Sequence, residues 1–130
     1  MKNILFTLVF FLGTSCLAMA QSFVVDGINY WVTGNGEVAV QKNDYSGVVN
    51  IPETVAHEGT IYRVTAIADR AFENCYSLTS VTIPNTVKSI GYAAFYYCNN
   101  LTSVAIPNSV ENLEGYVFFY CEKTGYSYNR

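Results

Sequence analysis

Three cysteines are the side chains of this sequence whose type and spacing most readily suggest chemistry. Cys75, Cys98 and Cys121 follow one another at a constant interval of 23 (98 − 75 = 121 − 98 = 23). If they occupy equivalent sites in successive turns of a stacked chain, their backbones lie about 4.7–4.9 Å apart, which is within the range that a disulfide tolerates. Their odd number and the Phe and Leu residues around them favour buried, reduced thiols, with one disulfide as the alternative. A metal site is not predicted, because no histidine or paired cysteine spacing accompanies them.

Acid–base catalysis would need a histidine or a pair of carboxylates. His57 is the only histidine, and no nucleophile motif accompanies it. Asp69 and Glu73 have i, i+4 spacing, and Glu111 and Glu114 have i, i+3 spacing. We expect His57 to be a solvated loop residue and both pairs to lie on solvated faces. The sequence therefore predicts a protein that is not an enzyme and has no cofactor.

A repeat with the same period as the cysteines must position these side chains. The segment Ile67–Val87 is followed by a similar segment, Ile90–Val110, and a third copy begins at Leu113. The same interval separates three phenylalanines, Phe72, Phe95 and Phe118. A fixed period in this range predicts a leucine-rich-repeat solenoid, in which each repeat is one turn stacked on the last.

Each repeat combines a short strand with a turn. Val81–Ile83 and Val104–Ile106 alternate between the two faces of a strand, and a proline ends each strand. Short helical turns are expected opposite the strands, at Ala71–Phe72 and Ala94–Phe95, with each phenylalanine in the core. The predicted fold is an α/β solenoid that is rich in strands, with short helical turns on one side.

Residues 1–20 are predicted to be a cleaved signal peptide. Lys2 precedes the apolar run Ile4–Leu12, and Ala18–Ala20 forms a small-residue cleavage signal before Gln21. A transmembrane anchor would need about 20 apolar residues, and this run is shorter. Cys16 leaves open a lipoprotein alternative, which would attach the protein to a membrane.

The charge of the remaining chain argues against nucleic acid as a partner. Without Lys2, six Lys and Arg residues face ten Asp and Glu residues, a net charge of −4 from Gln21 onward. No basic cluster is present to bind phosphates. The low charged fraction and the aromatic content of 15% suit a packed binding domain outside the cytoplasm.

Two zones follow the signal. Residues 21–47 lack the repeat and are expected to form a β-rich N-terminal cap, with a hairpin turning at Asp26-Gly27. The repeats occupy residues 48–130 and include an inserted hairpin that turns at Glu58-Gly59.

The last repeat departs from the pattern. The positions one full period after Leu101, Val104 and Ile106 are polar, so a final strand is not expected. Glu122–Arg130 is either a polar cap or the end of a shortened lineage.

The pattern Ala-Phe-x-x-Cys-x-x-Leu-x-x-Val-x-Ile-Pro, at Ala71–Pro84 and Ala94–Pro107, resembles the BspA-type (Treponema pallidum-type) bacterial leucine-rich repeat. The segment Phe23–Tyr30 is similar to the start of many secreted members. The resemblance implies a secreted or cell-surface binding protein of host-associated bacteria. Some relatives attach to extracellular-matrix proteins or to other microbes. The family has no catalytic residues and no binding motif to transfer.

Two surfaces could bind a partner. The strand side presents small polar residues, among them Thr79, Thr82 and Thr102. The opposite side presents aromatic residues, which either only shield the convex side and the last turn or form the binding site. Of the two surfaces they are the better binding candidate, because tyrosine buries a large area at a low entropic cost. They are Tyr92, Tyr96, Tyr97, Tyr116, Phe119 and Tyr120. The predicted function is recognition of an extracellular protein or glycan; the alternative is a structural module that associates end to end.

Overall fold

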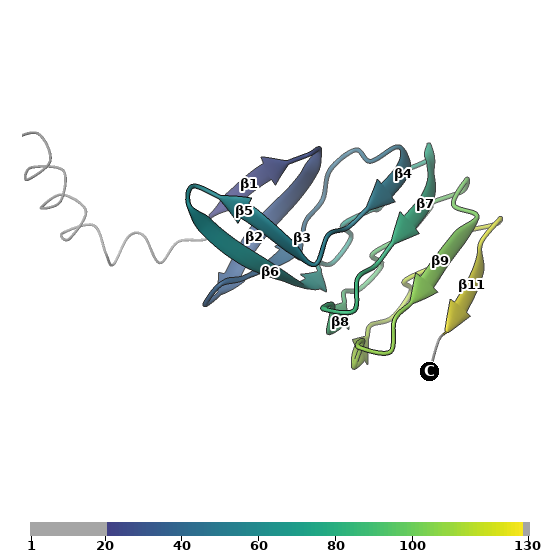
Figure 1. Ribbon diagram of the computed structural model, residues 1–130. Coiled ribbons are helices and arrows are strands. Elements are labelled where there is room, and N and C mark those ends of the chain that lie inside the picture. The colour runs from purple at the N-terminus through teal and green to yellow at the C-terminus, as the bar shows by residue number, and fades with distance from the viewer. Residues whose placement is uncertain (1–20, 129–130) are drawn as a thin grey trace, which may run out of the picture.

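The computed structural model describes residues 21–128, which form strands and turns (Figure 1). The predicted signal peptide, with Cys16 and the cleavage site, and residues 129–130 lie outside this range. None of the described segments is a helix of the length and hydropathy that a membrane crossing requires. The strands are β1 (Ser22–Val25), β2 (Ile28–Gly34), β3 (Glu37–Val40), β4 (Gly47–Asn50), β5 (Thr54–His57), β6 (Thr60–Ile67), β7 (Leu78–Thr82), β8 (Ser89–Ile90), β9 (Ser103–Ile106), β10 (Asn112–Leu113) and β11 (Gly125–Tyr128).

The strands form two sheets. One sheet has the order β1-β2-β3-β6-β8-β10, with β5 beside β6, and the other has the order β11-β9-β7-β4. In Figure 1, β4, β7, β9 and β11 lie side by side along one flank of the molecule. Pairing is parallel along this flank and between β6, β8 and β10, as expected when the chain returns to the same side once per repeat.

Both predicted hairpins are confirmed. β1 and β2 pair antiparallel around Asp26 and Gly27, whose φ angles are 49° and 78°. β5 and β6 pair in the same way around Glu58 and Gly59, with φ angles of 48° and 78°. Positive φ at both central residues is the geometry that two-residue hairpins favour. Because β3 then pairs parallel with β6, the N-terminal strands and the repeats share one sheet.

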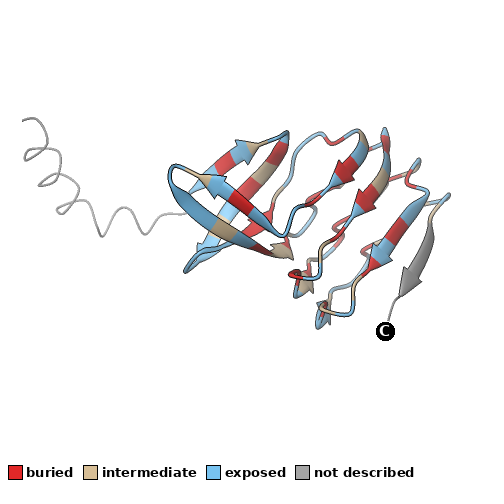
Figure 2. Ribbon diagram, in the orientation of Figure 1, coloured by how far each residue is buried: buried red, intermediate tan, exposed pale blue. Residues whose placement is uncertain are grey.

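The core lies between the two sheets, as the alternation of buried and exposed residues along the strands shows (Figure 2). Phe72 and Phe95 are fully buried, and their ring centroids are 4.8 Å apart with 11° between the planes. Phe118 continues the stack, 5.4 Å from Phe95. Val81 and Val104 also point inward and are 3% and 2% exposed. The prediction that equivalent side chains of successive repeats lie over one another is confirmed.

The predicted helical turns at Ala71–Phe72 and Ala94–Phe95 are wrong, because residues 21–128 contain no helix. Backbone N–H groups in this region alternate between two kinds of acceptor. Those of Ala71, Glu73 and Cys75 donate to the carbonyl three residues earlier. Those of Arg70, Phe72 and Asn74 donate to the next turn, at the carbonyls of Tyr92, Ala94 and Tyr96. An α-helix would need each N–H to bond four residues back, and half of these donors bond to the neighbouring turn instead.

The φ angles of the same segment repeat with the period of the sequence. Two residues of each turn are left-handed although they are not glycine. The first set has φ angles of 57°, 54° and 59° and consists of Arg70, Ala93 and Tyr116. The second set has φ angles of 61°, 58° and 59° and consists of Asn74, Tyr97 and Tyr120. Such angles are uncommon outside glycine, and here the bonds between turns hold them in place.

The prediction that the final strand is missing is also wrong. β11 pairs parallel with β9, and Tyr126 and Tyr128 stand opposite Val104 and Ile106. One full period after Val104 is Ser127, so the register of β11 is one position short of the repeat and brings tyrosines opposite the buried residues of β9. The open edge of β9 offers backbone groups for pairing, and tyrosine is favoured in strands.

Candidate functional site

The six aromatic residues predicted to bind a partner come together on one side of the molecule, and we call them the aromatic face. Four of them are well exposed: Tyr92 by 41%, Tyr116 by 56%, Phe119 by 45% and Tyr120 by 49%. Tyr96 and Tyr97 are half-buried beneath them. Exposed apolar rings in a continuous group are unusual on a protein that binds nothing.

The repeat period explains how these rings are arranged. Tyr96 stacks on Phe119 with centroids 6.0 Å apart, and Tyr97 stacks on Tyr120 at 4.6 Å. Each pair consists of the same position in two successive turns. Between the pairs, Tyr96 meets Tyr97 and Tyr120 edge to face, at 4.7 Å and 5.7 Å. Aromatic pairs prefer these geometries, so the rings hold one another in fixed positions.

A small hollow opens in the aromatic face. It has a volume of about 150 Å³ and is lined by Arg70, Ala93 and four of the rings, Tyr92, Tyr96, Tyr116 and Phe119. The Arg70 guanidinium lies 5.7 Å from the centre of the Tyr92 ring, within the distance of a cation–π contact. Arg70 was not among the site residues predicted from the sequence, although its place three residues before Glu73 indicates that it lies in the same turn.

Charged side chains fix the border of the hollow. Glu73 accepts from Arg70 Nη1 at 2.8 Å and from Lys42 Nζ at 3.1 Å. Partial desolvation raises the pKa of Glu73, but the hydrogen bond and charge of Lys42, together with Arg70, outweigh it and leave this pKa below its usual range. Burial by the neighbouring rings, with Tyr97 and Tyr120 contributing, raises the pKa of Tyr96. The hollow thus presents tyrosine hydroxyls beside one guanidinium.

Cys75, Cys98 and Cys121 are free thiols that lie in the core or pack against it, as the favoured interpretation predicts. Cys98 Sγ donates to the carbonyl of Phe72 at 3.0 Å, and Cys121 Sγ donates to that of Phe95 at 2.8 Å. Contact with Cys121 and burial raise the pKa of Cys98, and burial raises the pKa of Cys75. Each thiol therefore links its turn to an earlier part of the chain through a hydrogen bond to a backbone carbonyl. Within residues 21–128, no group of three His, Cys, Asp or Glu side chains could hold a metal ion.

The expectations about polar residues are wrong for His57 and Glu73. His57 is not a solvated loop residue, because it ends strand β5 and stacks on Phe23 with centroids 4.1 Å apart. Asp69 is exposed, as expected, and its carboxylate accepts from the Tyr92 N–H at 2.8 Å. Glu73 is half-buried instead of solvated, and it holds the two cations described above. Glu111 and Glu114 are exposed, as expected.

On the strand side, polar side chains partly form hydrogen bonds within the fold. Thr79, Thr82 and Thr102 are exposed, as the sequence predicts. The Thr102 hydroxyl, however, donates to the Thr79 carbonyl at 3.0 Å. In the described residues this side has no ring cluster comparable to the aromatic face.

Comparisons with known proteins agree with this fold. The family described as the BspA type leucine rich repeat region, in six copies, matches residues 48–127. A leucine-rich repeat protein from Bacteroides ovatus is 36% identical, with a TM-score of 0.73 over 82% of this chain and 28% of its own. A leucine rich cell surface protein from Faecalibacterium prausnitzii is 30% identical, with a TM-score of 0.72 over 82% of this chain and 30% of its own.

A third solved structure shows the fold alone. The leucine rich repeat protein of T. pallidum is 22% identical, with a TM-score of 0.60 over 82% of this chain and 45% of its own. Curated protein sequences give no match. The chain spans less than a third of the length of the Bacteroides and Faecalibacterium relatives.

Proposed function

The chain belongs to the BspA-type leucine-rich-repeat family, and from this membership we propose that it is a non-catalytic module that recognises another protein outside the cytoplasm. The observation that supports this function most directly is the aromatic face. Tyrosine and arginine are the residues that most often dominate binding energy at protein interfaces, and here they surround one hollow. Their mutual stacking reduces the entropy that a partner must remove on binding.

The place of action follows from the sequence and from one relative. Residues 1–20 have the pattern of a signal peptide with cleavage near Ala20, and lipid attachment at Cys16 is the alternative. The Faecalibacterium relative is described as a cell surface protein. We therefore propose a secreted or cell-surface location, and adhesion to host or microbial surfaces is one role that such a location permits.

We also propose a division of the chain into a β-rich cap, residues 21–47, and a solenoid of repeats from residue 48. The family match begins at residue 48, which supports the boundary. The parallel pairing of β4, β7, β9 and β11 supports a solenoid. β3 and β6 join the cap to the first repeat, so the cap covers an end of the core that would otherwise meet water.

Replacing Tyr92 and Phe119 together by serine tests the aromatic face. Both rings line the hollow, and both are well exposed, so their loss removes contact area without opening the core. We expect binding to weaken by about tenfold or more, the size expected for residues that dominate an interface. The measurement is a pull-down of labelled protein on purified extracellular-matrix proteins and on bacterial cells, followed by titration of any partner found.

Tyr76→Ser is the matched control, because Tyr76 is 53% exposed and lies outside the aromatic face. It should leave binding unchanged. Equal binding by the double variant and the wild type would remove the aromatic face as the binding site.

The second candidate function is end-to-end association of copies, and the free edges of the sheets favour it. β10 and β11 are the outermost strands at the C-terminal end of the described fold. In the preceding turn, the N–H groups of Ala93 and Tyr97 donate to the carbonyls of Gly115 and Phe119. Within residues 21–128, the equivalent N–H groups of Tyr116 and Tyr120 make no such bond. A second copy could supply their acceptors.

Light scattering coupled to size-exclusion chromatography tests this association. If the free edges pair, the measured mass should rise with protein concentration. Asn112→Lys should then return the mass toward that of a monomer, because it places a charge on the exposed edge strand β10. A monomeric mass of the wild type at every concentration would contradict association through these edges.

A further inference from the structure

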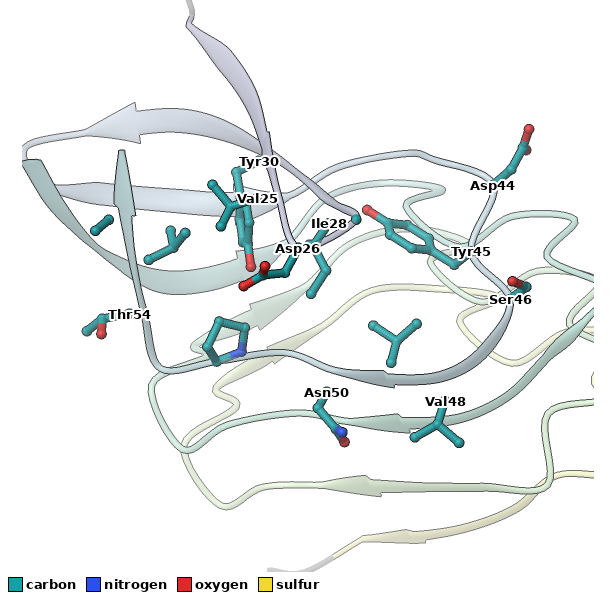
Figure 3. Close-up of a pocket in the computed structure, with 15 residues that line it drawn as sticks. Val25, Asp26, Ile28, Tyr30, Asp44, Tyr45, Ser46, Val48, Asn50 and Thr54 are labelled. Atoms are coloured by element: carbon teal, nitrogen blue, oxygen red, sulfur yellow. The ribbon is translucent and has the colours of Figure 1, made fainter. Parts of the chain in front are cut away.

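A larger hollow lies far from the aromatic face, between the turn of the β1–β2 hairpin and the segment that joins β4 to β5. Its volume is about 690 Å³, which is within the usual range of pockets that hold small ligands. Figure 3 shows strand β4 and the following turn on one side and the hairpin on the other. The two walls come from distant parts of the chain, the N-terminal cap and the first repeat.

Tyr30 is the residue of this hollow that is hardest to explain by the fold alone. It is 1% exposed, yet its hydroxyl makes no hydrogen bond to any group of residues 21–128. Tyr45, which also lines the hollow, is fully used: its hydroxyl donates to the Gln41 carbonyl at 2.6 Å and accepts from the Asn29 N–H at 3.2 Å. The fully buried hydroxyls without a partner in the described chain are those of Thr86 and Ser109, so the Tyr30 hydroxyl borders the hollow and offers a donor to whatever enters.

The Tyr30 hydroxyl has one charged neighbour. Figure 3 shows it beside the Asp26 carboxylate at the edge of the hollow, whereas the Asp44 carboxylate points away. Burial, followed by the charge of Asp26, raises the pKa of Tyr30 to about 12. The hydroxyl therefore stays protonated and can donate at neutral pH, and the nearby carboxylate can accept.

The remaining lining decides the chemistry of the ligand. Ser46, Asn50 and Thr54 supply groups that both donate and accept, and no lysine or arginine lines the hollow. An ammonium or guanidinium ligand only donates, so it could not accept from Tyr30. A sugar hydroxyl does both, and one such group could accept from Tyr30 while it donates to Asp26. Apolar side chains between the polar groups, among them Ile28 and Val55, suit the C–H faces of a sugar ring.

We propose that this hollow binds a neutral sugar unit of a glycan, with Tyr30 as hydrogen-bond donor and Asp26 as acceptor. The site is separate from the aromatic face, and its test does not depend on the proposed function. The cap then does more than cover the core, because it forms half of a binding site.

Tyr30→Phe is the decisive variant, since it removes one oxygen atom and keeps the ring. The probes are maltose, lactose, cellobiose and diacetylchitobiose, titrated at millimolar concentrations into the purified protein by ligand-observed NMR. We expect at least one sugar to bind and Tyr30→Phe to weaken it by about tenfold. The midpoint of urea unfolding should stay the same or rise, because the lost hydroxyl has no partner in the free protein.

Asp26→Asn separates the sugar from a cationic ligand. Asparagine suits the left-handed turn at this position and keeps an oxygen that accepts, so sugar binding should fall by less than tenfold. Tyr76→Phe, which removes a hydroxyl elsewhere, should change nothing. The proposal fails if no sugar binds, if Tyr30→Phe binds as well as the wild type, or if Tyr30→Phe lowers the unfolding midpoint clearly. It also fails if only a lysine-rich peptide binds and Asp26→Asn abolishes that binding.

Discussion

Replacing Phe95 by alanine should lower the free energy of unfolding by about 3–5 kcal/mol. Phe95 is fully buried, and its ring lies between those of Phe72 and Phe118, at 4.8 Å and 5.4 Å. The substitution removes the middle ring of this stack, and the neighbours on either side are held by their own turns, so the cavity cannot close. Because a domain of this size is stable by only about 5–15 kcal/mol, the variant should be close to unfolding.

Urea unfolding followed by circular dichroism measures this change. Tyr76→Ala is the control, because Tyr76 is 53% exposed and its loss should cost no more than about 0.5 kcal/mol. A cost for Phe95→Ala as small as that of the control would mean that the stack of rings does not stabilise the fold.

Gly91→Ala should destabilise the protein by about 3 kcal/mol, although it adds a single methyl group. A Cβ atom at this position would lie about 2.5 Å from the Asp69 backbone nitrogen and 2.8 Å from the Ala68 carbonyl carbon. The turns approach this closely because the Gly91 N–H donates to the Ile67 carbonyl at 2.9 Å. The Tyr92 N–H adds a bond to the Asp69 carboxylate at 2.8 Å. The methyl group would force the two turns apart and weaken both bonds.

Gly115→Ala provides the matched control one turn further on. There the nearest atoms to an added Cβ are ring carbons of Tyr92 at 3.9 Å, an ordinary contact. Its effect on the urea midpoint should be within about 0.5 kcal/mol of zero. Equal effects of the two substitutions would show that close approach of the turns is not the reason for glycine at position 91.

The sequence was sufficient to predict the family, the stacked core and both hairpins. The period places Phe72 and Phe95 at equivalent positions, and one apolar interior follows because a single repeat cannot bury them alone. The Asp-Gly and Glu-Gly pairs predict the hairpins because glycine tolerates positive φ at the second central position of each turn. These features depend on spacing or on residue type, and both can be read directly from the chain.

The features that the sequence did not predict depend on contacts between distant residues. Arg70 and Ala93 are left-handed, and neither residue type favours that conformation, so a helical turn was the natural expectation. The strand β11 was missed because its register is one position short of the repeat period. At the candidate site the six rings were predicted from spacing, but Arg70 and the hollow were not. The hollow beside Tyr30 lies between the β1–β2 hairpin and residues 44–56, and no local pattern marks it.

The alternating backbone donors of the turns have a consequence for how this protein can evolve. Each turn offers N–H groups to the turn after it and carbonyls to the turn before it. A duplicated stretch of one full period would therefore fit between two existing turns and meet on both sides the same partners that its neighbours already have. A gene of this kind can gain or lose whole repeats, because each new contact between turns uses the same backbone hydrogen bonds as the existing ones. The Bacteroides and Faecalibacterium relatives are each more than three times the length of the region that matches this chain.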